Sequence, residues 1–416
     1  MTPHGSKRNP HMPDAACRPL HILLAIDGMH PRGGGPPVVV VGSAVALAKR
    51  GHRVTILTTA NPEDEAVVRH TWPALDEHGI ALVFDVDERA SPLAVGKARR
   101  AVFEKLVRAA DVVHIHAVWH PMLIALGRIA RDIGVPYFVS VHGVFDRRAM
   151  ERVKSKLLKK RAAMHLLGIY GFLDHAAGVV FGSEAEAAES WIPSPRMRQI
   201  FVPNGAPDDL GLAELDHADR ARLFEAAPAQ RGWSRTLLCR SRIHPEKGID
   251  LLIAAFDRVA PDFPDAGLLI AGLRQDEAYE GKLRTSIAAS PIRERMIITT
   301  ELTGPSSQFL YRACDLFVMP SLAEGFSMSL IEGLANARPL LITRYCHMPV
   351  VADAGAGMVV EPTIAGLADG LRWFLRQDRE AWERMGMAAR QLFAENYTWD
   401  HVARRLEREY DASVAA

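Results

Sequence analysis

The feature that most constrains the fold is a regular alternation of short apolar runs with stretches of helical periodicity. The apolar runs are rich in Val, Ile and Leu and are too short to be helices, so they are predicted to be strands. Strands separated by helices form right-handed crossovers and a parallel sheet. In the first half of the chain the predicted strands are His21–Ile26, Arg53–Thr59, Ala81–Asp85, Asp111–His116, Pro136–Val141, Ala177–Phe181 and Ile200–Val202.

The alternation is interrupted once and then begins again. The segment Ala206–Arg235 is rich in Ala, Asp and Pro and has no strand pattern. A second series of predicted strands follows: Thr236–Arg240, Gly267–Ala271, Met296–Thr300, Leu316–Met319 and Leu340–Ile342. We therefore predict an α/β protein of two doubly wound, Rossmann-like domains facing a central cleft, with ligands at the carboxyl ends of the strands.

The domain boundaries follow from the same pattern. We predict a flexible tail over residues 1–19, an N-terminal domain over 20–205, a C-terminal domain over 206–395, and a terminal helix over 396–416 that packs back on the N-terminal domain. A length of 416 residues agrees with two cores of about 200 residues each. A single eightfold barrel is disfavoured, because the break after Asn204 and the helical end interrupt any eightfold repeat.

Composition excludes several classes of protein. Hydrophobic residues make up 48% of the chain and charged residues 24%, which is typical of a soluble globular protein. The formal net charge of +1 gives no indication of a nucleic-acid partner. The four cysteines have no paired short spacing and suit reduced thiols in the cytoplasm. No apolar run approaches the length of about 20 residues that a membrane span needs.

The clearest candidate site follows the predicted strand Leu316–Met319. Glu324, Gly325 and Phe326 form a turn, and Ser327 is expected to cap a helix over Ser327–Ala337 that contains Glu332. Free amides at the start of such a helix bind phosphate well, and carboxylates accept hydrogen bonds from sugar hydroxyls. Two glutamates at this spacing are common by chance, so the pattern is weak when taken alone.

A second loop strengthens the prediction of a phosphate site. Arg242 and Lys247 lie between the predicted strand Thr236–Arg240 and a helix that begins at Gly248. Strand-to-helix loops bind phosphates in doubly wound domains. Arg242 can hold two oxygens with its planar guanidinium group, and Lys247 supplies a point charge. Both would stabilise a departing diphosphate, although a pair of solvated loop cations would have the same sequence.

Together, these two loops resemble a known enzyme family. Ser-Arg-Ile-x3-Lys-Gly over residues 241–248 and Glu-Gly-Phe-x5-Glu over residues 324–332 are similar to the motifs of retaining glycosyltransferases of the GT-B fold, family four (group 1). The resemblance extends from the first strand to the final helix. It implies an enzyme that moves a hexose from a nucleotide-diphosphate sugar to a saccharide or lipid-linked acceptor, without a cofactor or a metal.

The resemblance also implies the role of each donor-site residue. Arg242 and Lys247 would contact the diphosphate of the donor and Glu332 its ribose, while Glu324 would contact hydroxyls of the transferred sugar and act in catalysis. The turn Gly325, Phe326 and Ser327 would complete the donor site. Gly34 and Gly35 would lie close under the diphosphate, because only glycine lets the backbone approach so closely. The C-terminal domain would then bind the donor and the N-terminal domain the acceptor.

Histidines mark the acceptor side. His114 and His116 lie on one face of their predicted strand, because side chains alternate with period two. In the family, the comparable strand ends in a histidine near the transferred sugar, so His116 is predicted to be catalytic. His142, after the strand Pro136–Val141, is the second candidate and is placed on the acceptor side. A histidine at a strand end can also do no more than satisfy backbone groups.

Two groups of residues suggest a metal site, but neither is expected to bind a metal. His114, His116 and His120 could suggest zinc, but no carboxylate or cysteine is placed to complete four ligands. Asp85 and Asp87 match the Asp-x-Asp signature of a metal-dependent glycosyltransferase fold, yet they follow a strand in a chain whose other motifs resemble the GT-B fold.

A basic run over residues 147–161 is the last notable feature. Such a run is usually a solvated helix face, but a basic amphipathic helix also attracts anionic lipid. It would dock a lipid-linked acceptor at the inner face of a membrane. The strand end at His142 and Gly143 and the basic run that follows are similar to those of family members in bacterial polysaccharide or glycolipid assembly, and this resemblance implies such a role. The sequence departs from the family at Ser241, where glycine is usual, and at Val350, where a carboxylate is common. The alternatives are a nucleotide-sugar epimerase or hydrolase of the same fold, and a catalytically silent partner that binds a sugar nucleotide.

Overall fold

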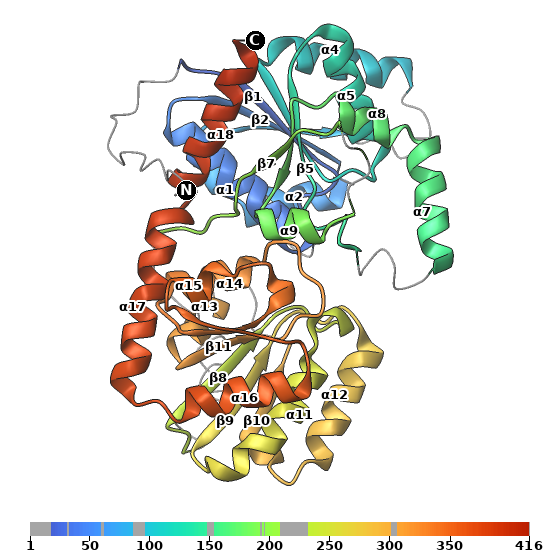
Figure 1. Cartoon of the computed structure of the whole chain (residues 1–416). Helices are drawn as coiled ribbons and strands as arrows, with labels where there is room; N and C mark the ends of the chain where they lie inside the picture. Colours follow the sequence, from blue (N-terminus) through green and yellow to red (C-terminus); the bar gives the residue numbers. More distant parts are fainter. Residues whose placement is uncertain are drawn as a thin grey trace, which may run out of the picture.

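The computed structural model describes residues 18–30, 33–59, 62–85, 96–147, 154–191, 194, 196–208, 232–300 and 306–415. It consists of two α/β domains, one above the other in Figure 1, each built on one parallel sheet. The predicted architecture of two doubly wound domains is therefore confirmed.

The N-terminal sheet has seven strands in the order β3-β2-β1-β4-β5-β6-β7. Each neighbouring pair is parallel. The chain order reverses between β1 and β4, which places the topological switch point of the sheet there. The strands are β1 (His21–Ile26), β2 (Arg53–Thr59), β3 (Ala81–Asp85), β4 (Val112–His116), β5 (Tyr137–Ser140), β6 (Gly178–Phe181) and β7 (Gln199–Phe201).

The C-terminal sheet has six parallel strands in the order β10-β9-β8-β11-β12-β13. Its switch point lies between β8 and β11, the two strands that precede the predicted donor loops. The strands are β8 (Arg235–Arg240), β9 (Ala266–Ala271), β10 (Met296–Thr299), β11 (Leu316–Met319), β12 (Leu340–Thr343) and β13 (Gly357–Val360).

Helices cover both faces of each sheet. The N-terminal domain carries α1 (Gly35–Lys49), α2 (Pro62–Thr71), α3 (Ala74–Glu77), α4 (Lys97–Ala109), α5 (Pro121–Ile133), α7 (Lys154–Leu166), α8 (Ile169–Asp174) and α9 (Glu184–Glu189). The C-terminal half carries η3 (Pro245–Lys247), α11 (Ile249–Val259), η4 (Ala260–Asp262), α12 (Glu277–Ala289), η5 (Arg293–Arg295), α13 (Ser306–Arg312), α14 (Met328–Ala335), η6 (Arg344–Cys346), α15 (Val350–Asp353), α16 (Ile364–Leu375), α17 (Arg379–Asn396) and α18 (Trp399–Val414). None of the helices that the structure describes combines the length and the apolar character needed to cross a bilayer.

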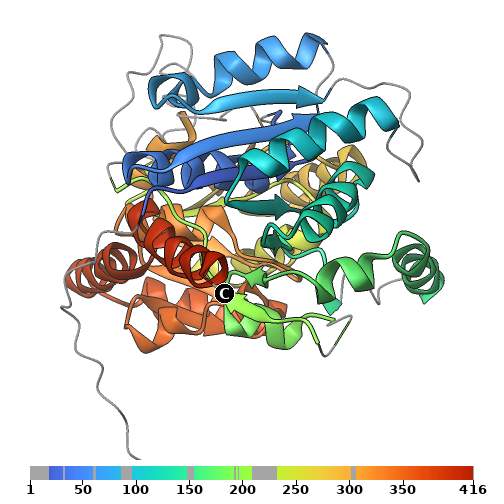
Figure 2. The same cartoon turned by 90° about the horizontal axis from the view of Figure 1, so that it is seen from above.

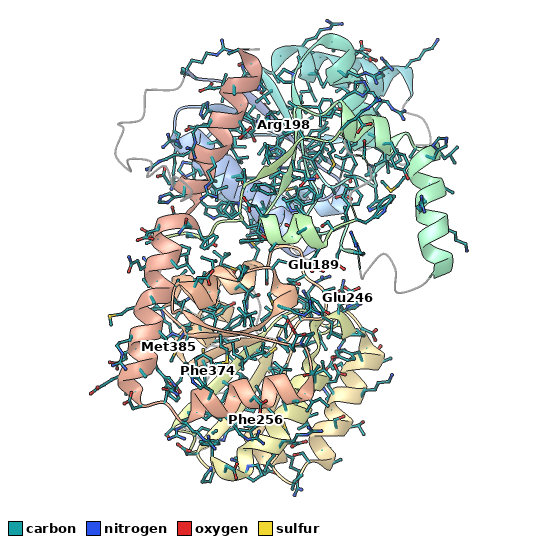
Figure 3. The ribbon with its side chains drawn as sticks, in the orientation of Figure 1. Glu189, Arg198, Glu246, Phe256, Phe374 and Met385 are labelled. Atoms are coloured by element: carbon teal, nitrogen blue, oxygen red, sulfur yellow. The ribbon has the colours of Figure 1, made fainter. Side chains whose placement is uncertain are left out.

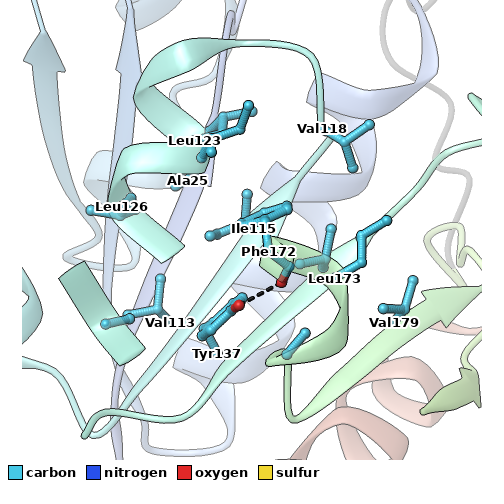
Figure 4. Packing of buried hydrophobic residues seen from close by; sticks show 14 of the residues in the cluster. Ala25, Val113, Ile115, Val118, Leu123, Leu126, Tyr137, Phe172, Leu173 and Val179 are labelled. Atoms are coloured by element: carbon cyan, nitrogen blue, oxygen red, sulfur yellow. Dashed lines mark hydrogen bonds between the residues drawn. The ribbon is translucent and has the colours of Figure 1, made fainter. Parts of the chain in front are cut away.

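The N-terminal core is built from the alternation of side chains along its strands. Val113 and Ile115 point to the face covered by α4, α5 and α8, where they are fully buried. Tyr137 of β5 lies on the same face, and its hydroxyl donates a 2.5 Å hydrogen bond to the carbonyl of Phe172 in α8 (Figure 4). A buried phenol is tolerated there because its polar group has a partner.

The opposite face of this sheet is covered partly by the end of the chain. After α17, the chain crosses back and α18 packs beside α1 on the N-terminal domain (Figures 1 and 2). The Trp399 ring lies against Gly42 of α1, where a Cβ atom would collide with it. Glu407 accepts a hydrogen bond from Arg50 and lies 2.8 Å from Nε2 of His52. Thus α18 is an integral helix of the N-terminal domain.

Several local predictions need correction or fall outside the described residues. The strand β13 was not predicted; its sequence Gly-Met-Val-Val begins with glycine, which is depleted in strands. Ser327 occupies the N-cap position of α14, but its side chain makes no capping hydrogen bond, so the predicted cap is wrong. Most of the predicted tail (residues 1–17), Asp87, residues 148–153 and most of the interdomain connection (209–231) lie outside the described residues.

Candidate active site between the two domains

The loops at the two switch points face each other across the domain boundary. From the C-terminal domain come the loop after β8, which contains Arg242 and Lys247, and the turn after β11, which contains Glu324. From the N-terminal domain come the glycine loop after β1, His116 at the end of β4, and His142 after β5. Figure 3 shows Glu246 of η3 and Glu189 of α9 on these facing sides of the two domains.

Lys247 and Glu324 form a buried ion pair. The Lys247 ammonium group contacts the Glu324 carboxylate, and both side chains are less than 10% exposed. The backbone joins the same two loops, because the amide of Leu322 donates to the carbonyl of Glu246 at 2.8 Å. Removing two charges from water is costly unless they compensate each other closely. The two predicted donor loops are therefore held together as one rigid unit.

Glu332 is held by Arg240, which was not among the predicted site residues. The Arg240 guanidinium group donates to Glu332, and the Tyr311 hydroxyl donates to the same carboxylate oxygen at 2.9 Å. Burial lowers the pKa of Arg240, but the charges of Glu332 and Tyr311 and the hydrogen bonds to both side chains together outweigh it and raise the pKa above its ordinary value. Burial and the charge of Glu332 raise the pKa of Tyr311, so the phenol stays a neutral donor. This network fixes the orientation of the Glu332 carboxylate.

Arg242 has a different environment from Arg240. Its side chain is exposed, and it donates to the side-chain oxygen of Gln275 at 2.7 Å. An arginine in this position can move onto a ligand without leaving a buried partner uncompensated. The loop ends at Gly248, which adopts a left-handed conformation and lies against the carbonyl of Pro320 with no room for a side chain. Gly248 thereby brings the Lys247 loop against the end of β11.

The N-terminal domain contacts the turn after β11 directly. A Cβ atom on Gly143 would lie 2.8 Å from Cα of Gly325, so the two backbones touch. Asn204 donates to the carbonyl of Phe326 at 2.9 Å. A Cβ atom on Gly35 would lie 3.6 Å from Met328, the first residue of α14. The glycine loop, with Gly34 at the N-cap of α1, therefore reaches the start of the helix that carries Glu332.

The predicted histidines form a stack at the carboxyl ends of β4 and β5. His116 Nδ1 lies 2.9 Å from His142 Nε2, and the two rings are stacked. The ring of His114 stacks on the other side of His116, with centroids 4.5 Å apart. Burial lowers the pKa of His116 well below its ordinary value and that of His142 to about 4. Both rings are therefore neutral near pH 7 and can donate and accept hydrogen bonds, but they carry no charge.

Neither metal site considered from the sequence has a structural counterpart in the described residues. No group of three His, Cys, Asp or Glu side chains among them is arranged to hold a metal ion. Asp85 is instead paired with Arg99, whose Nε lies 2.6 Å from its Oδ1. The histidines near β4 are stacked ring on ring, and a stack does not direct their nitrogens toward one common point.

A further polar cluster joins the domains beside the candidate site. Ser183 donates to the backbone carbonyl of His347 at 3.0 Å, and His347 Nε2 lies 3.9 Å from Asp146 Oδ2. Glu186 is buried and accepts a 2.7 Å hydrogen bond from the amide of Gly182. Burial raises the pKa of Glu186 to about 7, against the opposing effects of that amide and of His347.

Known proteins resemble this chain along most of its length. Residues 34–205 match the family described as "Glycosyl transferase 4-like domain", and residues 224–392 match "Glycosyl transferases group 1". Glycogen synthase from Mycobacterium tuberculosis is 27% identical over 91% of this chain and 92% of its own length. Alpha-monoglucosyldiacylglycerol synthase from Streptococcus pneumoniae is 24% identical over 77% of this chain and 70% of its own length.

The fold has close structural counterparts as well. The crystal structure of HepE from Anabaena, in complex with UDP and glucose, superposes with a TM-score of 0.71 at 15% identity. The match covers 94% of this chain and all of that protein. The motifs after β8 and β11, the two facing parallel sheets and the matches over both halves agree with one another, and we conclude that the chain belongs to the group 1 glycosyltransferases, with the two-domain GT-B fold.

Proposed function

We propose that this glycosyltransferase moves a hexose from a nucleoside-diphosphate sugar to a saccharide or lipid-linked acceptor and retains the anomeric configuration. One observation carries the proposal. The Lys247–Glu324 pair and the oriented Glu332 carboxylate lie on one side of the domain boundary, opposite the glycine loop and His116. The groups that would bind the anion, the ribose and the sugar in this proposal thus lie on facing sides of one boundary.

On the donor side, each group suits one part of a sugar nucleotide. Lys247 and the exposed side chain of Arg242 would stabilise the negative charge that grows on the leaving diphosphate. Glu332, fixed by Arg240, would accept hydrogen bonds from the ribose hydroxyls. Glu324 would do the same for hydroxyls of the transferred hexose. A site of this kind needs no metal, because lysine and arginine supply the positive charge.

Donor identity can be tested by thermal shift, because a ligand that binds only the folded state raises Tm by mass action. The complex of HepE with UDP and glucose makes UDP-glucose the first compound to test. GDP-mannose, ADP-glucose and UDP-N-acetylglucosamine extend the series. We expect one of these sugar nucleotides to raise Tm in the wild type and not in Lys247→Met. The absence of a shift with every sugar nucleotide would contradict the proposal.

Retention follows from a front-face mechanism in which the acceptor attacks on the side that the diphosphate leaves. The neutral histidines fit this mechanism, because it depends on charge stabilisation and positioning more than on a strong base. The anomeric configuration of the new glycosidic bond, read by proton NMR of the product, is the direct test. A product with the inverted configuration would refute retention and leave the transferase activity itself unaffected.

Of the two proposed kinds of acceptor, a saccharide or a lipid-linked one, the second is supported by a helix of the N-terminal domain. In both views α7 stands out from the body of the N-terminal domain (Figures 1 and 2). The described side chains Lys159 and Arg161 are exposed there, and Leu166 is 73% exposed. A protruding helix with basic and apolar side chains suits the surface of an anionic membrane. The named activity of the Streptococcus pneumoniae relative, synthesis of a glucosyldiacylglycerol, is consistent with a lipid acceptor.

Membrane contact can be tested by flotation with vesicles that contain phosphatidylglycerol. We expect the wild type to float with these vesicles and Lys159→Glu/Arg161→Glu to stay in solution. The difference in flotation between the two proteins should be larger at low salt, where charges are screened less. The matched control is Arg376→Glu/Arg379→Glu, which reverses two exposed charges in the C-terminal domain. Equal flotation of the wild type and both variants would refute docking through α7.

A further inference from the structure

The terminal helix α18 contacts the histidine stack, which consists of His114, His116 and His142. The Tyr410 hydroxyl lies 2.5 Å from Nδ1 of His114, a contact between residues 296 positions apart in the chain. Both side chains are almost fully buried. The same helix is anchored by Glu407 to His52 and by the Trp399 ring against α1. A side chain from the last element of the chain therefore reaches the layer directly beneath the candidate catalytic histidine.

The His114 ring is held on both of its nitrogens. Nδ1 pairs with Tyr410, and Nε2 lies 2.8 Å from the Ser140 hydroxyl in β5. Burial lowers the pKa of His114 to about 3, so the ring is neutral and has one donor and one acceptor. With both nitrogens occupied, the ring cannot flip about its χ2 axis without losing two buried hydrogen bonds. The plane of the His114 ring is fixed in consequence.

That plane in turn determines the position of His116. The two rings stack with centroids 4.5 Å apart and an angle of 23°. His116 uses Nδ1 to reach His142, while its Nε2 is buried and has no hydrogen-bond partner among the described residues. A buried imidazole nitrogen without a partner is costly in a folded protein and indicates a ligand group that completes it. The orientation of Nε2 therefore depends on the two contacts that hold the ring, namely the stack on His114 and the bond to His142.

We propose that Tyr410 is a positioning residue for sugar transfer, which orients His116 by fixing the His114 ring on which His116 stacks. The inference rests on the proposed function, in which His116 lies beside the transferred sugar. It assigns the terminal helix a part in the active site in addition to its part in the fold. Tyr410 itself contacts neither the donor nor the acceptor.

The test compares two phenylalanine variants. Tyr410→Phe removes the hydroxyl and keeps the ring, which also packs edge-on against Phe138. The matched control is Tyr137→Phe, which removes an equally buried tyrosine hydroxyl on the other face of the same sheet. Both variants should lower Tm to a similar extent. We expect Tyr410→Phe alone to lower kcat, by roughly 5- to 100-fold, because small errors in position are costly in catalysis, with the donor KM nearly unchanged.

Two further measurements separate positioning from a general structural effect. In a His116→Ala background, Tyr410→Phe should cause little further loss of kcat, because two residues that act through one group are not additive. Side-chain 15N NMR of histidine-labelled enzyme, without any ligand, should show changed nitrogen shifts for both His114 and His116 in Tyr410→Phe. Turnover can be followed as nucleotide release from whichever sugar nucleotide raises Tm.

Each result supports or overturns the inference. Equal loss of kcat in the two phenylalanine variants, or a full effect of Tyr410→Phe in the His116→Ala background, would overturn it. Unchanged His116 shifts in Tyr410→Phe would do so as well. Full turnover in His116→Ala would instead refute the proposed role of His116, and the NMR shifts would still decide whether Tyr410 orients that ring.

Discussion

The contact between Gly143 and Gly325 allows a quantitative test of domain closure. In Gly143→Ala, the new Cβ atom would lie 2.8 Å from Cα and 3.1 Å from N of Gly325, both backbone atoms. Carbon atoms in contact are normally about 3.5–4.0 Å apart, so the domains must separate by roughly 1 Å at this point. Overpacking of this kind costs about 1–3 kcal/mol.

Backbone strain must be separated from this steric effect. Gly143 has φ near 75°, so alanine there also carries a strain of about 1–2 kcal/mol. Gly134 has φ near 86° and nothing within 4 Å of its missing Cβ, so Gly134→Ala carries the strain alone. The difference between the two variants should therefore be the interdomain term. A penalty of 1–3 kcal/mol on the closed state corresponds to a loss of about 5- to 150-fold in kcat/KM.

The assay is kcat/KM for the wild type and both variants, together with the radius of gyration from small-angle scattering in saturating donor. We expect Gly143→Ala alone to reduce kcat/KM and to increase the radius. Gly325→Ala should behave similarly, because its Cβ would meet Gly143 from the other side at 2.9 Å. If both Gly143→Ala and Gly134→Ala kept wild-type kcat/KM, this contact would not belong to the catalytically competent form.

Three further predictions concern the charged groups. Glu332→Gln should raise the donor KM at least tenfold and cost about 1–3 kcal/mol of stability, because it weakens a charged hydrogen bond to the partly buried Arg240. Equilibrium unfolding with donor titration measures both, and an unchanged KM would contradict the ribose assignment. Lys247→Met should lower the free energy of unfolding by about 3–5 kcal/mol, because it leaves Glu324 buried without its partner. Adding Glu324→Gln should restore stability but not turnover. Recovered turnover would refute a role of this pair in the reaction. The pKa of Glu186 is raised from 4.5 to about 7, so the native state binds the additional proton and stability should fall by about 3 kcal/mol as pH rises from 4.5 to 7 and then level off. In Glu186→Gln this dependence should disappear from denaturant unfolding curves recorded between pH 4.5 and 8, and a slope equal to that of the wild type would assign the titration to another group.

The sequence predicted the sheets well because parallel strands buried on both faces are continuous apolar runs, and such runs are easily recognised. It also predicted which loops meet, since the carboxyl ends of strands at a switch point share one edge. Arg240 was overlooked, because it was assigned only as the last residue of a strand. The available signal was a charged residue directly after the apolar run Leu-Leu-Cys. The strand that ends with this residue lies next to the strand that leads to Glu332.

Other features could not be predicted from local pattern. The contact of Tyr410 with His114 joins residues from opposite ends of the chain, and periodicity does not encode which sheet face a terminal helix will cover. The touching backbones of Gly143 and Gly325 depend on how two independently folded sheets are oriented. The buried state of Lys247 and Glu324 was likewise hidden, because lysine and glutamate are usually solvated.

The return of α18 to the N-terminal domain has a consequence for biosynthesis. Phe138, Val112 and Ile22 on one face of the first sheet pack in a cluster that includes Val402, Leu406 and Tyr410. The ribosome adds about 5–20 residues per second. The helix that covers this face is therefore completed up to tens of seconds after residue 205. During that interval, the nascent first domain exposes an apolar surface that no local segment can bury. The enzyme should therefore depend on chaperones during translation. A chain that is truncated by a stop codon just before Trp399 should aggregate.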